Sequence, residues 1–338
     1  MREHLTAMEI STPWILLAAT VIVSSCGGSV PSPGLSSPTL PTKPVAIVEY
    51  PADNPSDLTL GPDGAIWFTG HGPNYIGRIT AAGSVSLFTT PTSGEKRSGI
   101  VAGPDGNLWF SEFTGAKIGR LTPGGVFTMF ALPTDGAVTN LAVGPDNNLW
   151  FAESGPNLIG RVTTAGVINE YRIPSLASDP RYITLGPDGA LWFAENAANR
   201  IGRVTTGGQI QEFPLPSPNS GPTGITSGGD GNLWFTELDG NRIGRLTPTG
   251  VVTEFAVPTP ASNPYAIAAA PDGSLWFTEF DVAANQIAHI TPDGRITEFK
   301  VPTARSNPAG IVVAKDGAVW FVENSGGRIA RMTPALMA

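Results

Sequence analysis

The chain has 338 residues, a formal net charge of −8, and charged side chains at only 14% of its positions. This sparse, acidic charge argues against nucleic-acid binding, which needs a basic surface. The single cysteine, Cys26, excludes any disulfide bond within a monomer.

The first 44 residues predict an export signal and a tether. Residues 14–23 form an apolar run that is too short to cross a bilayer as a helix but suits the core of a secretory signal. The run leads into Val-Ser-Ser-Cys-Gly, which resembles a bacterial lipoprotein signal that is cleaved before its cysteine. We therefore expect a signal peptide over 1–25, a lipid anchor on Cys26, a Ser/Pro-rich tether over 26–44, and an extracytoplasmic location on the cell envelope, with no other contact to the membrane.

From residue 45 onward the chain is a seven-fold repeat. The dipeptide Trp-Phe recurs every 41 to 44 residues, at Trp67, Trp109, Trp150, Trp192, Trp234, Trp276 and Trp320. A fixed period of this length indicates one supersecondary unit that is repeated. In each copy, four short runs of β-branched and aromatic residues are separated by Gly, Pro and Asp, which is typical of four β-strands, a to d.

Adjacent bulky residues on strand b imply that each sheet is covered on both faces, because neighbouring side chains on a strand point in opposite directions. Seven such four-stranded sheets predict an all-β, seven-bladed β-propeller. The last copy supplies a strand c at 328–332 but no strand d, whereas residues 45–51 resemble a strand d and precede the first copy. We therefore expect one domain over 45–338, a monomer, in which the N-terminal strand completes the last blade and closes the ring.

Two features that recur around the array are interpreted as scaffold. The Asp of the turn before strand b, such as Asp63, is better explained by seven identical hairpin turns than by seven cation sites. An Arg of strand c follows the Trp by 11 residues in six copies, which favours a cation–π pair across the two strands. In the sixth copy, His289 takes the place of this Arg.

Variable polar residues just before the Ile of strand a predict a ligand funnel at the top of the ring. In a propeller of this design, they surround the central channel on the face that carries the b–c loops. Variation at one ring of a regular array indicates a binding site, here for a small molecule, a peptide or a glycan. The predicted funnel residues are Asp57, Arg97, Asn140, Arg181, Tyr182, Thr223, Tyr265 and Asn307.

A second ring places a glutamate three residues after the Trp in six blades, among them Glu112, Glu279 and Glu323. Carboxylates that converge near a funnel are suitable ligands for a divalent cation. Recurrence in six blades favours a different role, in which each glutamate pairs within its own b–c hairpin, as Glu112 would with Lys117.

The repeat, with its Gly-Pro-Asp-Gly, Leu-Trp-Phe-Thr-Glu and Ile-Gly-Arg-Ile-Thr motifs, closely resembles the virginiamycin B lyase (streptogramin lyase) family over residues 45–338. The resemblance implies a seven-bladed propeller and a Mg²⁺-assisted elimination that opens the ring of type B streptogramin antibiotics. It also implies a funnel site with a Glu-Pro-His-Gly-Ile motif in the last blade, a Pro-His-Gly-Ile motif one blade earlier, and a further Glu near the end of the last strand b.

The chain departs from the family at those positions. Its last-blade motif is Asn-Pro-Ala-Gly-Ile, so that Ala309 stands where the resemblance places the general base and Asn307 where it places a metal-binding Glu. One blade earlier, Tyr265 replaces the other His, and Glu323 is the one family position retained. Because general-base catalysis is worth about 10²–10⁴-fold in rate, we do not expect streptogramin lyase activity.

Three hypotheses remain. We favour a lipid-anchored propeller that binds a ligand or partner through its funnel. A second is a diverged Mg²⁺-dependent carbon–oxygen lyase, in which His71 of the first b–c loop acts as base and Glu323 holds the metal with Asp57 or Glu279. A third is a metal-dependent hydrolase resembling gluconolactonase-like propellers, which would use the glutamate ring and Asn307.

Overall fold

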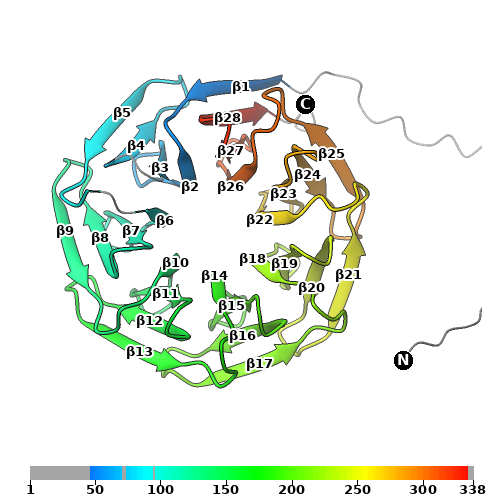
Figure 1. The fold of residues 1–338 in the computed structure, drawn as a ribbon, viewed down its shortest axis with the longest axis horizontal. Coiled ribbons are helices and arrows are strands. Elements are labelled where there is room, and N and C mark those ends of the chain that lie inside the picture. The colour runs from blue at the N-terminus through cyan, green and yellow to red at the C-terminus, as the bar shows by residue number, and fades with distance from the viewer. Residues whose placement is uncertain (1–45, 71–73, 94–95, 334–338) are drawn as a thin grey trace, which may run out of the picture. The chain divides into compact units, whose positions relative to one another are not determined.

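The computed structural model describes residues 46–70, 74–93 and 96–333. Within them, all regular structure is β-strand, and 28 strands form seven antiparallel sheets of four strands each. The sheets stand around a central axis as the blades of a propeller, with one strand of each blade innermost (Figure 1). The prediction of an all-β, seven-bladed β-propeller is confirmed.

Each blade runs from an innermost strand a to an outermost strand d. Blade 1 contains β2 (Pro55–Leu60), β3 (Ile66–Gly70), β4 (Tyr75–Ile79) and β5 (Val85–Thr89), and blade 2 contains β6 (Arg97–Ala102), β7 (Leu108–Glu112), β8 (Lys117–Leu121) and β9 (Phe127–Ala131). Blade 3 contains β10 (Val138–Val143), β11 (Leu149–Glu153), β12 (Leu158–Val162) and β13 (Ile168–Arg172), and blade 4 contains β14 (Pro180–Leu185), β15 (Leu191–Glu195), β16 (Arg200–Val204) and β17 (Ile210–Pro214). Blade 5 contains β18 (Pro222–Ser227), β19 (Leu233–Glu237), β20 (Arg242–Leu246) and β21 (Val252–Ala256), and blade 6 contains β22 (Pro264–Ala269), β23 (Leu275–Glu279), β24 (Gln286–Ile290) and β25 (Ile296–Lys300). Blade 7 contains β26 (Pro308–Val313), β27 (Val319–Glu323), β28 (Arg328–Thr333) and β1 (Ala46–Pro51).

The ring closes through the N-terminal strand, as predicted. Strand β1 pairs antiparallel with β28, with Ala46 opposite Thr333 and Pro51 opposite Arg328. The last sheet therefore has the order β1-β28-β27-β26, and its innermost strand packs beside β2 of blade 1. In Figure 1, β1 lies on the outside of the blade that also holds the C-terminal strands.

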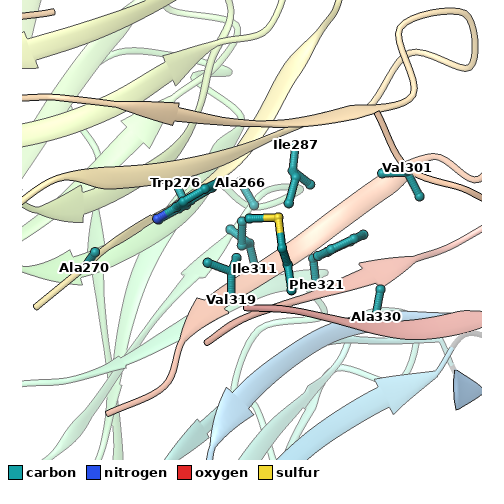
Figure 2. Packing of buried hydrophobic residues seen from close by; sticks show 10 residues of the cluster. Ala266, Ala270, Trp276, Ile287, Val301, Ile311, Val319, Phe321 and Ala330 are labelled. Carbon is teal, nitrogen blue, oxygen red and sulfur yellow. The ribbon is translucent and has the colours of Figure 1, made fainter. Parts of the chain in front are cut away.

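The core lies between the blades. The Trp of one strand b packs on the Phe of the next, so that Trp276 of blade 6 shares a buried cluster with Ile311, Val319 and Phe321 of blade 7 (Figure 2). In blades 1 to 5 a Gly of strand c makes room for the Phe of its own blade, because a Cβ on Gly202 would lie 2.1 Å from the ring of Phe193; in blades 6 and 7 this position holds Ala288 and Ala330. Bulky neighbours on strand b are thus buried on both faces, as the sequence predicted.

The structure confirms both scaffold interpretations. In blade 4, Asp188 Oδ1 accepts hydrogen bonds from Trp192 Nε1 at 2.9 Å and from the backbone N–H of Ala190 at 3.2 Å. Its second oxygen accepts from Arg203 Nε at 2.6 Å. The guanidinium carbons of six strand-c arginines lie 5.5 to 5.9 Å from the Trp ring centroids, and the His289 ring lies 4.9 Å from that of Trp276.

Candidate functional site

A β-bulge at the start of each strand a sets which side chains reach the central channel. In blade 1, Pro55 pairs with Gly70 and Leu58 pairs with Phe68, so that Ser56 and Asp57 both lie opposite Thr69. The other six blades have a register shift at the same place. Because a bulge redirects the side chains of its extra residues, two successive positions per blade can face the channel.

Two adjoining cavities lie among these bulges. The first has a volume of about 90 Å³, and we call it the acidic cavity because Asp57 is the only charged side chain among the described residues that line it; its lining is Ser56, Asp57, Ser98, Tyr182, Tyr265, Phe280, Ala309 and Asn324. The second has a volume of about 190 Å³, and we call it the basic cavity; its lining is Lys96, Ser98, Phe113, Thr139, Arg181, Tyr182 and Tyr265. The two cavities share Ser98, Tyr182 and Tyr265. Residues from blades 1, 2, 3, 4, 6 and 7 thus meet at the top of the channel.

Two tyrosines from different blades meet between the cavities. The rings of Tyr182 and Tyr265 pack edge to face, with centroids 5.9 Å apart and an angle of 90° between them. Tyr265 also packs on Phe280, at 5.2 Å and 32°. Burial, followed by the charge of Asp57, raises the pKa of Tyr182 well above its ordinary value, and burial raises that of Tyr265 as well. Both hydroxyls are therefore neutral hydrogen-bonding groups at physiological pH.

Asp57 is a buried carboxyl group whose hydrogen bonds come from the backbone. It accepts from the N–H groups of Leu58 and of Ile100 in blade 2, and burial raises its pKa to about 7. Among the described residues, no basic side chain forms an ion pair with it. At the equivalent bulge position of blade 3, the neutral Asn140 Oδ1 accepts from the N–H of Ile183 in blade 4 at 3.4 Å.

The basic cavity has two cationic side chains on one side of the tyrosines. Arg181 is held by Asp179, with its Nε at 2.9 Å and its Nη2 at 2.6 Å from the same carboxylate oxygen. The backbone carbonyl of Arg181 accepts from Thr139 Oγ1 at 2.7 Å, which fixes the bulge of blade 4 against blade 3. Lys96 and Phe113 complete the rim from blade 2.

The structure brings together four of the eight predicted funnel residues, namely Asp57, Arg181, Tyr182 and Tyr265. Three of the other four form hydrogen bonds at the edge of the channel. Asn140 acts as described above, Thr223 Oγ1 accepts from Asn196 Nδ2 at 3.1 Å, and Asn307 Nδ2 donates to the Phe280 carbonyl at 2.8 Å.

Arg97 lies outside the two cavities, and its side chain is completely buried. It occupies the first position of strand a, which is proline in five other blades, and the next residue, Ser98, faces the channel instead. Its Nη2 donates to the Thr92 carbonyl at 2.8 Å and lies 3.4 Å from Glu112 Oε1. The bulge explains the shift of one residue between the predicted and the observed lining.

The glutamate ring is buried between blades and does not reach the channel. In blades 3 to 7, each strand-b glutamate lies beside a second glutamate from strand d, and the pairs are Glu153 with Glu170, Glu195 with Glu212, Glu237 with Glu254, Glu279 with Glu298, and Glu323 with Glu49. Burial, and then the charge of the second carboxylate, raises the pKa of the strand-b glutamate to about 8 in blades 3 and 4 and to about 7 in blades 5 to 7. Pairing with a basic residue, which the sequence suggested for Glu112, holds in blade 2 alone, where Lys117 Nζ lies at 3.9 Å.

Comparison with known proteins places this chain in a family. Residues 43–332 match the model of the virginiamycin B lyase family. The chain belongs to that family. A solved streptogramin B lyase is 40% identical, with a TM-score of 0.82 over 86% of this chain and 97% of its own. Virginiamycin B lyase from Staphylococcus aureus is 39% identical, with the same TM-score over 86% of this chain and 100% of its own.

A third solved structure is described as a catalytically inactive His-to-Ala variant of the S. aureus virginiamycin B lyase with quinupristin, and its identity, coverage and TM-score equal those of the S. aureus enzyme. No curated protein matches the sequence of this chain. In the part of the chain that the structure describes, no helix is long and apolar enough to cross a membrane.

The residues at the positions of the virginiamycin B lyase site do not fit Mg²⁺, which prefers several oxygen ligands in near-octahedral geometry. Among the described residues, no three His, Cys, Asp or Glu side chains gather into a group that could hold a metal. Glu279 and Glu323 lie in separate buried pairs, and the Asn307 amide donates to a carbonyl. His71 and Cys26 lie outside the described residues.

Several cavity residues were not predicted from the sequence. Phe113 and Phe280 each follow the strand-b glutamate directly, at a position that is polar in blades 3, 4 and 7. Asn324 occupies that same position in blade 7. Variation one residue beyond the glutamate ring was therefore a second signal of the site, alongside the variation before the Ile of strand a.

Proposed function

We propose that this propeller binds a ligand in its central channel and does not open streptogramin rings. The observation that carries the proposal is the lining of the acidic cavity, where Ala309 and Tyr265 stand at the positions that family resemblance gives to two histidines. A methyl group and a neutral phenol of raised pKa are poor general bases near neutral pH. The cavity keeps polar and aromatic groups that suit binding.

One solved relative supports the proposed loss of lyase activity. The solved His-to-Ala variant of virginiamycin B lyase is described as catalytically inactive, so the loss of one histidine is enough to remove activity in that protein. Both enzyme hypotheses also need carboxylates that converge on the channel, and among the described residues Asp57 is the one carboxylate that lines the acidic cavity. We therefore do not propose a diverged lyase or a metal-dependent hydrolase.

Incubation with quinupristin and Mg²⁺ tests the loss of lyase chemistry. We expect intact antibiotic after prolonged incubation, with the S. aureus enzyme as positive control. Ring opening by elimination leaves the mass unchanged, so the product is detected by its chromatographic retention and its fragmentation pattern. A ring-opened product that this protein forms catalytically would overturn the proposal.

Ligand-observed NMR with a library of small molecules and short peptides tests binding in the channel. The matched variant is Ser98→Trp, because Ser98 lines both cavities and a Trp side chain there would fill them. We expect binders to the wild type that are lost in the variant, while the melting temperature shows that the variant is folded. A library without any binder, or binders that are unaffected by the substitution, would contradict channel binding.

We also propose that the protein is exported and held at the membrane by a lipid on Cys26, as its N-terminal sequence predicts. Metabolic labelling with an alkyne fatty acid should label the wild type and not Cys26→Ala. The variant should also move from the membrane fraction to the soluble fraction of the envelope. Labelling that persists in Cys26→Ala would sink this proposal.

A further inference from the structure

The acidic cavity combines one carboxylate with three aromatic rings. Asp57 faces it from blade 1, Tyr182 from blade 4, Tyr265 from blade 6, and Phe280 from the loop after strand b of blade 6. The ring of Tyr265 contacts both others, Tyr182 edge to face at 5.9 Å and Phe280 in a tilted arrangement at 5.2 Å between centroids. The cavity is thus a small aromatic enclosure with one acidic wall.

Among the residues that the structure describes, none forms an ion pair with the carboxyl group of Asp57. Burying a carboxylate is costly unless a proton or a cation compensates its charge. Its two backbone hydrogen bonds, from Leu58 and Ile100, leave further acceptor capacity on its oxygens. A cation supplied by a ligand would complete this site.

Aromatic rings and a carboxylate together recognise alkylammonium groups. The faces of Tyr and Phe rings attract cations, and this attraction grows when the site is desolvated. A volume of about 90 Å³ equals the share of about three water molecules in the liquid, at about 30 Å³ each. The cavity therefore has room for a compact headgroup, and the rest of a ligand must extend beyond it.

The basic cavity indicates what that remainder carries. It adjoins the acidic cavity across Ser98, Tyr182 and Tyr265, and it offers the side chains of Lys96 and Arg181. Asp179 neutralises part of the Arg181 charge at 2.6 Å, whereas no ion pair is recorded for Lys96 among the described residues. Cationic side chains at this end favour an anionic group on the ligand.

We propose that the channel binds a small zwitterion, with its alkylammonium group in the acidic cavity and its anionic group in the basic cavity. This inference rests on the proposed function, because it names the chemical class of the channel ligand. It differs from the streptogramin site of the family in using Asp57, Tyr182 and Tyr265 of this chain, and it needs no metal.

Isothermal titration calorimetry with two trimethylammonium carboxylates tests the proposal. The probes are glycine betaine and 4-(trimethylammonio)butanoate, which differ in the span between their charges. Each has an isostere in which an uncharged tert-butyl group replaces the trimethylammonium head and the carboxylate is kept, 3,3-dimethylbutanoate and 5,5-dimethylhexanoate respectively. We expect at least one betaine to bind saturably, and at least tenfold more tightly than its isostere. Equal affinities within both pairs would overturn the assignment of a cation to the acidic cavity.

Asp57→Asn is the matched variant, because Asn140 shows that an amide at this bulge position still accepts the N–H of the neighbouring blade. We expect the variant to keep its melting temperature and to lose at least tenfold in betaine affinity. Lys96→Met should weaken the betaine and leave the affinity for choline, which has no carboxylate, unchanged. Betaine binding that is unaffected by Asp57→Asn would contradict the proposal.

The pH dependence gives a second readout. The titratable groups that face Asp57 in the cavity are Tyr182 and Tyr265, and both stay neutral near pH 7 because burial raises their pKa values. Asp57, with a pKa of about 7, must be ionised to attract an ammonium group. Betaine affinity should therefore rise between pH 6 and pH 8 in the wild type and stay flat in Asp57→Asn; a flat wild-type profile would count against Asp57.

The two proposals fail in different ways. If library compounds bind in a manner that Ser98→Trp abolishes, while no betaine is preferred over its isostere, the zwitterion inference is wrong and channel binding stands. If no compound of either kind binds the channel, both are wrong.

Discussion

Blades 3 to 7, which we call the arc, and the junction formed by blades 1 and 2 pack their strands b and d with different residues. In blade 5, Ser220 donates its N–H and Oγ to Asn199 Oδ1 of blade 4, at 2.7 and 2.8 Å. Ser217 donates in the same way to Glu254, which lies beside the buried Glu237. The same pattern of Asn, Ser and two glutamates recurs in blades 4, 6 and 7, so these interfaces are near copies of one another.

At the junction the paired glutamates are replaced. In blade 2, Met129 occupies the strand-d position, and Glu112 faces the buried Arg97 instead of a second acid. In blade 1, Gly70 and Leu87 take both positions, so that no carboxyl group is present there. Asp57 of the same blade then places a carboxyl group in the channel. In the arc the paired glutamates are buried between blades. At the junction, Asp57 instead lines the acidic cavity, where a ligand can contact it.

The largest expected effect concerns the buried ion pair at the junction. Arg97→Met removes the cation beside Glu112, both side chains being fully buried, and leaves the carboxylate poorly compensated, because Lys117 Nζ lies 3.9 Å away and that side chain is 34% exposed. Such a loss costs about 3–5 kcal/mol, measured as the free energy of unfolding in urea. Arg242→Met in the arc is the control, because that guanidinium is 37% exposed and lies 3.9 Å from Glu254, and it should cost less than about 1 kcal/mol.

The Arg97→Met, Glu112→Leu double variant sharpens this test. A hydrophobic pair of similar volume removes the uncompensated charge, so most of the lost stability should return. If Arg97→Met alone costs no more than Arg242→Met, the Arg97–Glu112 pair does not support the junction.

A smaller effect on stability is expected from a change of pH, and its source is the glutamate pairs of the arc. In the unfolded chain Glu195 titrates near 4.5, whereas burial, and then Glu212, raises its folded pKa to about 8. Between these values the folded protein holds a proton that the unfolded chain has released, so stability falls as pH rises from about 4.5 through 8. Each pKa unit is worth about 1.4 kcal/mol, and we expect the wild type to lose at least about 2 kcal/mol between pH 5.5 and 8.5.

Glu195→Gln removes this titration, so the variant should lose less stability over the same range in thermal or urea unfolding. The substitution at the same strand position of blade 2, Glu112→Gln, should instead destabilise the protein at both pH values, because it deprives Arg97 of its partner. Equal pH slopes for the wild type and Glu195→Gln would show that the carboxyl pairs do not hold the proton.

The fold could be predicted from the sequence because it depends on features that repeat. Adjacent bulky residues at Trp67 and Phe68, and at six later positions, fix burial on both sides of each sheet. Closure was predictable because residues 46–51 read as the missing strand d, and their pairing with β28 bears this out. Both inferences need the order of residues along single strands and no three-dimensional register.

The site was predicted only in part, because it depends on register. Each bulge adds one residue that no sequence motif marks. In blade 2 the bulge follows Arg97, so that Arg97 is buried and Ser98 lines the cavities. The glutamate pairs were not predicted from the sequence, for a related reason. Glu195 and Glu212 are both visible in the sequence, but they meet only because strands b, c and d align across the blade.

The smallest expected difference between the two regions lies at the bottom turns, which are alike in blades 1 and 4. Asp188 in the arc and Asp63 at the junction each accept hydrogen bonds from a Trp Nε1, a turn N–H and a strand-c arginine. Each Asp→Ala substitution should therefore cost about 1–2 kcal/mol, with no resolvable difference between Asp188→Ala and Asp63→Ala in urea unfolding. A clearly larger loss at Asp63 would mean that the junction depends on its bottom turn as well as on its altered top. The division between a uniform scaffold and a specialised channel face would then fail for blade 1.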